Sequence, residues 1–530
     1  MSGPDAIVMD VMAWLRATVP SALDGAHHLQ LDSRRIAPGD VFVAVPGVVA
    51  GRSADGRDYV RAAAALGAVA ALVEAQGWTG ADVDLPVLPV RGLRQLIGSL
   101  AATFYGRPSE KLLAIGVTGT NGKTSCSQWI AQLLTLEGQR CAVIGTVGSG
   151  FPGAVFAGAA LTTPDAVALQ REVRALLDEG AQALAMEVSS IGLDQGRVDG
   201  MAFDIALFTN LTRDHLDYHG TLERYEAAKA RLFDWPTLSH AVINLDDAAG
   251  RRLADRVARR GGPQLIGFTA QDAAAPAPLA LRLSAHEVRA TATGLRFEVD
   301  DGRRRIDVAV PLVGAFNVSN LLGVLGTAVA AGVALERACA VLPRLAPPPG
   351  RMQRIGGEGA PLAVVDYAHT PDALAQALAA LAPLARARGG RLWVVFGAGG
   401  DRDAGKRAPM GEAAARLADR VVITSDNPRT EAPEAIVDAI ARGVPADRAA
   451  RVERIVDRAE AIAHALAIAD DADVVLIAGK GHEDYQDIGG VKRPFSDVEH
   501  ARAALARRAP GSAARGEAGG ARGAAREAAA

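Results

Sequence analysis

Gly116-Val-Thr-Gly-Thr-Asn-Gly-Lys-Thr124 is the stretch that decides the fold of this chain. It joins an apolar run, Leu112–Val117, that predicts a strand to a segment, Ser125–Glu137, that predicts a helix ending at Gly138. Glycines at such a junction let backbone N–H groups approach a polyphosphate at the helix N-terminus. The spacing departs from the strict G-x4-GK[ST] pattern because Gly116 stands one residue too early. A turn that only caps the helix is therefore the alternative.

Two side chains of this loop carry the functional interpretation. Lys123 is placed to reach the β- and γ-phosphates of a nucleotide, and the Thr124 hydroxyl is placed to bind Mg²⁺. The order of strand, glycines, Lys-Thr and helix therefore predicts a phosphate-binding loop.

Outward from this loop, short β-rich runs alternate with helical patterns, which is typical of α/β units on a largely parallel sheet. Further strands of the middle segment are predicted at Ala142–Thr146, Ala183–Val188, Ile205–Phe208 and Ala241–Asn244. Leu295–Val299 and Ile306–Val310 alternate around Asp301-Gly302 and predict a hairpin appended to this segment.

In the last segment, four apolar runs each end in a polar, glycine-containing or charged cluster. The runs are Leu362–Val365, Leu392–Phe396, Val421–Thr424 and Val474–Ala478, and the clusters are 366–372, 397–403, 425–431 and 479–485. In a parallel sheet these clusters emerge at the carboxyl edge, where open α/β folds bind ligands. We therefore expect a binding site at this edge.

Two breaks, Tyr105-Gly-Arg-Pro-Ser109 and Pro347-Pro-Pro-Gly350, divide the 530 residues. We expect domains at 1–108, 109–346 and 347–510, followed by a tail, 511–530, of Ala, Gly, Arg and Glu that has too little bulk to fold.

Composition excludes several classes of protein. The 57 Lys+Arg and 60 Asp+Glu give a net charge of −3, so a dedicated nucleic-acid binder is not expected. Three cysteines do not form a disulfide framework and suit a cytoplasmic protein. The N-terminus lacks the pattern of a signal peptide, and the longest apolar run, Leu321–Leu335, is shorter than the ~20 residues of a membrane span. We interpret that run as a buried helix and expect no membrane insertion.

Three further residues follow the middle strands and carry open alternatives. Glu187 ends an apolar strand, where a carboxylate needs a partner, and His215 follows the next strand. Together they suggest a second divalent ion, although Glu187 paired with an arginine and His215 as an ordinary loop histidine explain the spacing equally well. Lys229 by itself suggests a surface lysine in an ion pair with Glu226.

A set of longer motifs resembles the Mur ligase family. The motifs are Gly119-Thr-Asn-Gly-Lys-Thr124, Met186-Glu-Val-Ser-Ser190, Asp214-His-Leu-Asp-Tyr-His-Gly220, Gly314-Ala-Phe-Asn-Val-Ser-Asn320, Asp366-Tyr-Ala-His-Thr-Pro-Asp372, Asp426-Asn-Pro-Arg429 and Gly479-Lys-Gly-His-Glu-Asp-Tyr-Gln486. They occur in the family's order from about Leu29 to His500. The last two resemble the members that add diaminopimelate.

The resemblance implies three α/β domains, with a central P-loop ATPase domain and a Rossmann-like C-terminal domain. It implies an ATP-dependent ligase of peptidoglycan precursor synthesis, and so a role in cell-wall biogenesis, cell shape and cell division. ATP would phosphorylate the D-Glu side-chain carboxylate of UDP-N-acetylmuramoyl-L-Ala-D-Glu. The amine of meso-diaminopimelate would then attack the acyl phosphate.

The resemblance also implies roles for residues of the nucleotide and metal sites. The loop residues Gly119, Thr120, Asn121, Gly122, Lys123, Thr124 and Ser125 would hold the ATP phosphates. Thr124 and Glu187 would bind one Mg²⁺ and His215 would help to bind another. Lys229 matches the lysine that the family carbamylates with CO₂, which replaces the surface-lysine interpretation. Asn320, Arg351 and Asp366 would contact the nucleotide.

The substrate residues are implied in the same way. For the UDP-linked dipeptide they are Leu31, Ser33, Thr162, Thr163, Ser189, Gln195 and Arg197, with an ordinary strand-to-turn as the alternative for Leu31-Asp-Ser-Arg34. For diaminopimelate they are Arg402, Asp426, Asn427, Pro428, Arg429, Gly479 and Glu483. An arginine at 429 favours diaminopimelate over lysine because it pairs with a carboxylate that lysine lacks.

The chain departs from the family pattern at Ile191, where relatives often have His, and at Leu161, where they often have Asn. The segment Gly47–Gly56 is longer than in relatives, so no uridine contact is assigned there. The alternatives are another ligase of the superfamily, such as the D-Ala-D-Ala-adding enzyme or a folylpolyglutamate synthase, and a non-catalytic ATP-binding interaction protein. We expect a cytoplasmic monomer.

Overall fold

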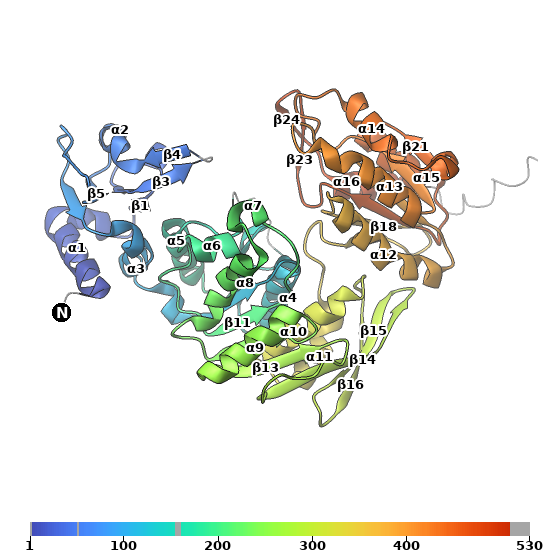
Figure 1. Cartoon of the computed structure of the whole chain (residues 1–530), viewed down its shortest axis with the longest axis horizontal. Coiled ribbons are helices and arrows are strands. Elements are labelled where there is room, and N and C mark those ends of the chain that lie inside the picture. The colour runs from blue at the N-terminus through green and yellow to red at the C-terminus, as the bar shows by residue number, and fades with distance from the viewer. Residues whose placement is uncertain (1–2, 50–51, 154–160, 509–530) are drawn as a thin grey trace, which may run out of the picture. The chain divides into compact units, whose positions relative to one another are not determined.

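The computed structural model describes residues 3–49, 52–153 and 161–508 (Figure 1). The predicted tail, 511–530, lies outside the described residues. The described chain forms two compact units. The first contains the residues up to 285 together with 300–305 and 319–341, and the second contains 286–299, 306–318 and the residues from 342 onward.

The N-terminal part of the first unit has a parallel four-stranded sheet of order β1-β2-β5-β6. Its strands and helices are α1 (Pro4–Thr18), β1 (Leu29–Gln30), β2 (Val41–Ala44), α2 (Val60–Ala65), β5 (Ala70–Glu74), β6 (Val87–Val90) and α3 (Leu93–Phe104). The strands β3 (Pro46–Val49) and β4 (Arg52–Asp55) form a separate antiparallel hairpin. All residues of β2 and β5 are buried, as expected for parallel strands covered on both faces.

The remainder of the first unit contains a sheet with β7 at its centre, neighbouring β10 and β11. The order is β14-β13-β12-β11-β7-β10-β8-β9, parallel except for β9, and β14 takes part through Leu281–Ser284. The strands are β7 (Leu113–Thr118), β8 (Cys141–Gly145), β9 (Gly148–Gly150), β10 (Ala183–Glu187), β11 (Ile205–Phe208), β12 (His240–Asn244), β13 (Gln264–Thr269) and β14 (Leu281–Thr291). The predicted parallel sheet is confirmed, with strand ends shifted by one residue.

The helices of this part are α4 (Lys123–Leu136), α5 (Ala166–Asp178), α6 (Ser190–Asp194), α7 (Leu216–His219), α8 (Leu222–Ala230), α9 (Ala248–Arg260), α10 (Phe316–Ala330) and α11 (Leu335–Val341). The α4 helix begins two residues earlier than predicted, since the left-handed Gly122 (φ 86°) precedes its first turn. Lys123 and Thr124 therefore lie at the helix N-terminus. The buried helix predicted over 321–335 is confirmed as α10 but ends earlier than predicted, because the left-handed Gly332 (φ 90°) follows it.

The second unit has a six-stranded sheet of order β17-β18-β22-β19-β20-β21. The helices and strands of this unit, some of them outside that sheet, are β15 (Gly294–Asp300), β16 (Arg305–Val310), β17 (Gln353–Gly356), β18 (Leu362–Asp366), α12 (Pro371–Arg388), β19 (Leu392–Phe396), α13 (Arg407–Leu417), β20 (Arg420–Ile423), α14 (Pro433–Ala441), β21 (Val452–Arg454), α15 (Arg458–Ile468), β22 (Val474–Ala478), β23 (Tyr485–Ile488), β24 (Val491–Pro494) and α16 (Asp497–Ala506). The strands β18, β22, β19 and β20 are parallel neighbours. The prediction that four polar clusters follow one sheet edge is confirmed.

The observed helices and strands differ from the predicted ones at several places. The strands β13, β14, β17 and β21 were not predicted, whereas the predicted hairpin strands are present as β15 and β16. No helix or strand crosses Pro347–Gly350. Within the described ranges, no helix combines the length and the apolar character that crossing a membrane requires. The exact domain boundaries stay a prediction.

Candidate active site

The predicted phosphate-binding loop of the first unit is held by the chain that follows β11. The N–H groups of Thr120 and Asn121 donate to the backbone oxygen (2.8 Å) and the side-chain oxygen (2.9 Å) of Asn210. Lys123 Nζ donates to the carbonyls of Gly119 (3.0 Å) and Thr120 (2.8 Å). The lysine thus lies along the loop, and Ser125 occupies the same first turn of α4. The strand, loop and helix have the arrangement that the sequence predicted for a phosphate-binding loop.

Glu187 lies at the end of β10 and is 1% exposed. Its Oε2 accepts hydrogen bonds from Thr124 Oγ1 (3.0 Å) and Thr146 Oγ1 (3.1 Å), and its Oε1 accepts one from Thr146 N (2.7 Å). The alternative of an arginine partner is wrong, since all three of these donors belong to threonines. A buried carboxylate beside a threonine hydroxyl at the phosphate loop is an oxygen donor set that suits Mg²⁺.

Lys229 of α8 is 2% exposed and joins the same loop. Its Nζ donates to Gly119 O (2.7 Å) and lies 4.3 Å from the centre of the Tyr225 ring. Burial, and next the charge of Lys123, hold the pKa of this amine well below its usual range. The interpretation of Lys229 as a surface lysine paired with Glu226 is wrong, because Glu226 pairs with Arg252 instead (2.6 Å).

Tyr225 links the lysine to the loop, because its hydroxyl lies 3.1 Å from Thr120 Oγ1. Burial raises the pKa of this phenol to about 12, so the hydroxyl keeps its proton at neutral pH. Replacing Tyr225 by Phe keeps the ring and removes one hydrogen bond, which costs about 1 kcal/mol. We expect the KM for ATP to rise about 5-fold in an initial-rate assay. Tyr105→Phe, which loses one bond from Leu29 N, is the control and leaves this KM unchanged.

His215 begins α7 in a left-handed conformation (φ 50°) and is half exposed. Its Nε2 lies 3.6 Å from Asp214 Oδ2, and its ring centre lies 6.2 Å from that of Tyr225. The imidazole is therefore near the loop, and its role toward a metal stays a prediction. In the described part of the chain, no group of three or more His, Cys, Asp or Glu side chains forms a metal site by itself. Phosphate oxygens and water would have to complete the coordination of Mg²⁺.

The residues predicted for the muramoyl dipeptide form a connected network beside Glu187. Thr163 Oγ1 donates to Glu187 O (2.9 Å) and accepts from Ser189 N (3.0 Å). Arg197 donates to Thr163 O (3.0 Å) and to Gln195 Oε1 (2.6 Å from Nη2). Thr162 joins through Thr146, with 3.1 Å between their hydroxyl oxygens. The structure thus groups these residues, while their contacts with a substrate stay a prediction.

Five other predicted residues lie outside this network. Leu31 packs against the N-terminal core, and Ser33 begins a short 3₁₀ turn after it. Asn320 belongs to α10 and lies close to Gly122, where a Cβ atom would collide with its side-chain oxygen. Arg351 and Asp366 belong to the second unit. Asp366 accepts from Met352 N (2.9 Å) and Ala368 N (3.0 Å), and burial raises its pKa. The roles of all five toward ligands stay predictions.

The residues predicted for diaminopimelate meet at the carboxyl edge of the second unit's sheet. Arg429 has a left-handed backbone (φ 51°), exchanges hydrogen bonds with Asp487 O (2.9 Å) and Gly489 N (2.6 Å), and donates from Nη1 to Gly400 O (2.6 Å). Pro428 precedes it, and Arg402 is exposed on the neighbouring loop. A Cβ atom at Gly399 would lie 3.0 Å from Arg429 Nη1 and 3.9 Å from Arg402 Cγ. The side chains of both arginines therefore lie beside Gly399.

Asn427 and Glu483 are joined by a lysine that the sequence analysis did not assign. Lys480 is 0% exposed, and its Nζ donates to Asn427 Oδ1 (3.0 Å) and Glu483 Oε2 (2.9 Å). Asn427 Nδ2 also donates to Glu483 Oε2 (2.9 Å). Gly479 donates from its N–H to Asp366 O (3.1 Å), and a Cβ atom on it would lie 2.5 Å from Asp426 Oδ2. The loops after β18, β20 and β22 are therefore in direct contact.

The partners that hold these groups in place were not predicted from the sequence. Lys480 and Gln486 stand inside the quoted motif 479–486, so their position was a usable signal. Tyr225 stands outside the quoted motifs, one helical turn before Lys229 on α8. Thr146 and Asn210 follow strands β8 and β11, and only the parallel register brings them to the loop. The glycine-containing loop at the N-terminus of α4, with Lys123 and Thr124 on it, is the arrangement typical of nucleotide-binding domains with a phosphate loop.

Three family models match this chain. The Mur ligase family catalytic domain matches residues 25–105, the Mur ligase middle domain residues 117–328, and the Mur ligase glutamate ligase domain residues 350–481. The chain therefore belongs to the Mur ligase family and has its three-domain α/β fold.

Relatives over most of the chain carry one name, UDP-N-acetylmuramoyl-L-alanyl-D-glutamate–2,6-diaminopimelate ligase. The protein of that name from Ralstonia nicotianae is 56% identical over 94% of this chain and 96% of its own length. That from Pseudomonas aeruginosa is 51% identical over 90% and 94%. A solved structure with the same name is 39% identical, with a TM-score of 0.67 over 90% of this chain and 94% of its own.

Proposed function

We propose that this chain is the ligase that joins meso-2,6-diaminopimelate to the D-Glu side-chain carboxylate of UDP-N-acetylmuramoyl-L-Ala-D-Glu, with ATP hydrolysed to ADP and phosphate. The reaction lengthens a peptidoglycan precursor. The observation that carries the proposal is the 56% identity, over 94% of the chain, to a relative named for this activity. The second unit supports the amino acid, because two arginines and two carboxylates converge at its sheet edge.

The first chemical step is phosphoryl transfer, which depends on positioning and charge neutralisation more than on covalent help from the protein. In our proposal, the N–H groups from Gly119 to Ser125 hold the ATP phosphates, and Lys123 turns its ammonium toward them. Thr124 and Glu187 would hold Mg²⁺, which neutralises charge on the phosphate oxygens. Thr163, Ser189 and Arg197 orient the dipeptide so that its carboxylate faces the γ-phosphate.

Lys229 fits the proposed carbamate, because a neutral amine is the form that attacks CO₂. The lowered pKa leaves more of this amine neutral at neutral pH than an exposed lysine would have. The product, R–NH–COO⁻ with release of one proton, is an anion beside Lys123. Such an anion would orient the ammonium of Lys123 and, with His215, extend the oxygen and nitrogen donors available to a metal.

In the second step the amine of diaminopimelate attacks the acyl phosphate, and phosphate leaves. Arg429, with Arg402, binds the carboxylate that distinguishes diaminopimelate from lysine. Asp426 and Glu483 receive its ammonium, and the N–H of Gly479 and the amide of Asn427 complete the pocket. Leu31 and Ser33 bind the uridine, while Asn320, Arg351 and Asp366 bind the nucleoside of ATP. We propose that the enzyme acts as a cytoplasmic monomer, with no nucleic-acid partner.

The test is ATP-dependent phosphate release with UDP-N-acetylmuramoyl-L-Ala-D-Glu, comparing meso-diaminopimelate with L-lysine at equal concentration. Release that requires diaminopimelate supports the proposal. Equal rates keep the ligase and reject the pocket assignment. No release, with folded protein, Mg²⁺ and bicarbonate present, favours another ligase of the superfamily or a non-catalytic ATP-binding protein.

Arg429→Met tests the basis of the selectivity. Losing a charge-assisted bidentate pair costs about 1.5–3 kcal/mol, so we expect kcat/KM for diaminopimelate to fall about 10- to 100-fold. The value for lysine changes little, so the ratio of the two falls by the same factor. Arg420→Met, an arginine at the start of β20, is the control. An unchanged ratio would reject Arg429 as the selectivity residue.

A further inference from the structure

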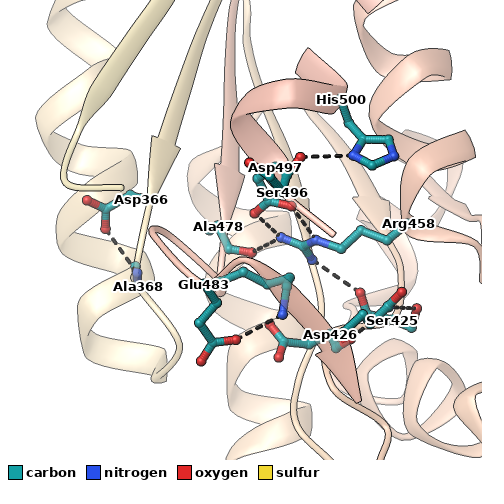
Figure 2. Close-up of polar contacts among 12 residues, drawn as sticks. Asp366, Ala368, Ser425, Asp426, Arg458, Ala478, Glu483, Ser496, Asp497 and His500 are labelled. Atoms are coloured by element: carbon teal, nitrogen blue, oxygen red, sulfur yellow. Dashed lines mark hydrogen bonds and ion pairs between the residues drawn. The ribbon is translucent and has the colours of Figure 1, made fainter. Parts of the chain in front are cut away.

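Arg458 and Asp497 form a buried ion pair behind the proposed amino-acid pocket. Both side chains are 0% exposed, and the pair is bidentate, with Nε to Oδ1 and Nη2 to Oδ2 both at 2.7 Å. Neither residue belongs to the motifs that point to ligand binding. Figure 2 shows the guanidinium surrounded by Asp497, Ala478 and Ser425.

The remaining donors of Arg458 reach two pocket loops. Its Nη1 donates to Ser425 O (3.2 Å) and its Nη2 to Ala478 O (3.0 Å). Ser425 directly precedes Asp426, and Ala478 directly precedes Gly479. One planar group thus ties together the chain ends that leave β20 and β22.

The loops after β20 and β22 lie so close together that their spacing depends on these hydrogen bonds of Arg458. Gly479 has φ 119°, and a Cβ atom on it would lie 2.5 Å from Asp426 Oδ2. On the other side, Gln486 Nε2 donates to Ser425 Oγ (3.0 Å) and Asp426 O (2.7 Å). The position of the Asp426 carboxylate is therefore set by neighbours on both sides.

Stability alone does not account for this pair. Arg458 is the first residue of α15, and a cation is unfavourable at a helix N-terminus. Burying both charges also costs solvation that their attraction does not reliably repay, and apolar replacements of such pairs are often neutral or stabilising. An apolar pair could not replace the guanidinium, whose donors in fixed geometry reach the Asp497 carboxylate and two backbone carbonyls together.

We propose that Arg458, held by Asp497, is a positioning residue that fixes Asp426 and Gly479 for binding of the amino-acid substrate. This role rests on the proposed function. It acts on the diaminopimelate pocket and leaves the nucleotide loop untouched.

Arg458→Lys is the direct test, since lysine keeps the charge beside Asp497 but cannot hold both carbonyls. We expect the KM for diaminopimelate to rise about 10-fold, corresponding to one or two lost hydrogen bonds, with kcat and the KM for ATP within about 2-fold. The double variant Arg458→Met/Asp497→Leu removes both charges of the pair, so neither partner is left buried alone. It gives the same rise in KM without a fall in melting temperature.

Arg388→Lys is the matched control. Arg388 donates to Asp471 O (2.7 Å) and Ala472 O (3.2 Å), which lie before β22 at the opposite end of that strand. This variant lowers the melting temperature and leaves the KM for diaminopimelate unchanged. A wild-type KM in Arg458→Lys, or equal changes for all substrates, overturns the positioning role, as does loss of folding in both Arg458 variants. Absence of diaminopimelate-dependent release in the wild-type protein instead rejects the proposed function.

Discussion

Lys229→Ala is expected to lower kcat for phosphate release about 10³-fold, the effect of removing a group that organises charge at a phosphoryl-transfer site. The side chain is buried, contacts Gly119 O and lies beside Lys123, so no lysine on the surface can take its place. The fold should survive, because burial of an amine is itself unfavourable and its removal relieves that cost. Thermal unfolding and an initial-rate assay measure the two effects.

The carbamate makes a further prediction about the wild-type protein. Removing dissolved CO₂ lowers its activity, and adding bicarbonate restores it. The Lys229→Ala variant does not respond to bicarbonate. Acidification from neutral pH reduces the neutral fraction of the Lys229 amine, which is the form that attacks CO₂, and so weakens the response to bicarbonate; the burial that lowers the pKa of this amine raises that fraction at any given pH. Lys111→Ala, at an exposed lysine, is the control. A Lys229→Ala enzyme within 10-fold of wild type would refute the assignment.

Glu187→Gln is expected to lower kcat about 10²- to 10³-fold and to raise the Mg²⁺ concentration required for half-maximal rate. The reason lies in the donors around it. Thr146 N can only donate, so the glutamine oxygen must face it, and the new NH₂ group then faces the Thr124 and Thr146 hydroxyls. Thr124 Oγ1 then accepts a hydrogen bond from that NH₂ group, which competes with a metal for the lone pairs of the hydroxyl.

Measurement of rate against Mg²⁺ concentration checks this result. Glu226→Gln, which alters the partly exposed pair with Arg252, is the control and keeps the wild-type Mg²⁺ dependence. If Glu187→Gln shows a wild-type Mg²⁺ curve, Glu187 is only a structural acceptor for the two threonines.

The parallel sheets and the phosphate loop were predictable because their signals are local. Apolar runs of four to six residues identify β7, β10, β11 and β19 to within one residue, and glycines follow β7 and β19. Weaker strands such as β17 and β21 were missed, since they are short and only partly buried at the sheet edges. Their formation depends on neighbouring strands, which a local pattern does not contain.

Lys229 shows the limit of local reasoning most clearly. Its spacing from Glu226 on α8 fits a surface ion pair, and only the motif resemblance pointed elsewhere. The tertiary structure decides the matter, because α8 places Lys229 against Gly119 while Arg252 of α9 takes Glu226. Lys229 and Gly119 are 110 residues apart in the sequence, and Arg252 and Glu226 are 26 apart, so no local pattern encodes either contact.

Local sequence patterns were enough to predict the main parallel strands, the phosphate loop and the clusters at the carboxyl edge, because these follow from hydrophobic periodicity and glycine placement within short segments. Only the tertiary structure decided which partners hold those groups: Thr146 on Glu187, Tyr225 on Thr120, and Lys480 and Arg458 beneath the amino-acid pocket. The physical reason is that a buried charge or donor must be satisfied by whatever the fold brings within about 3 Å, and that neighbour can come from anywhere in the chain.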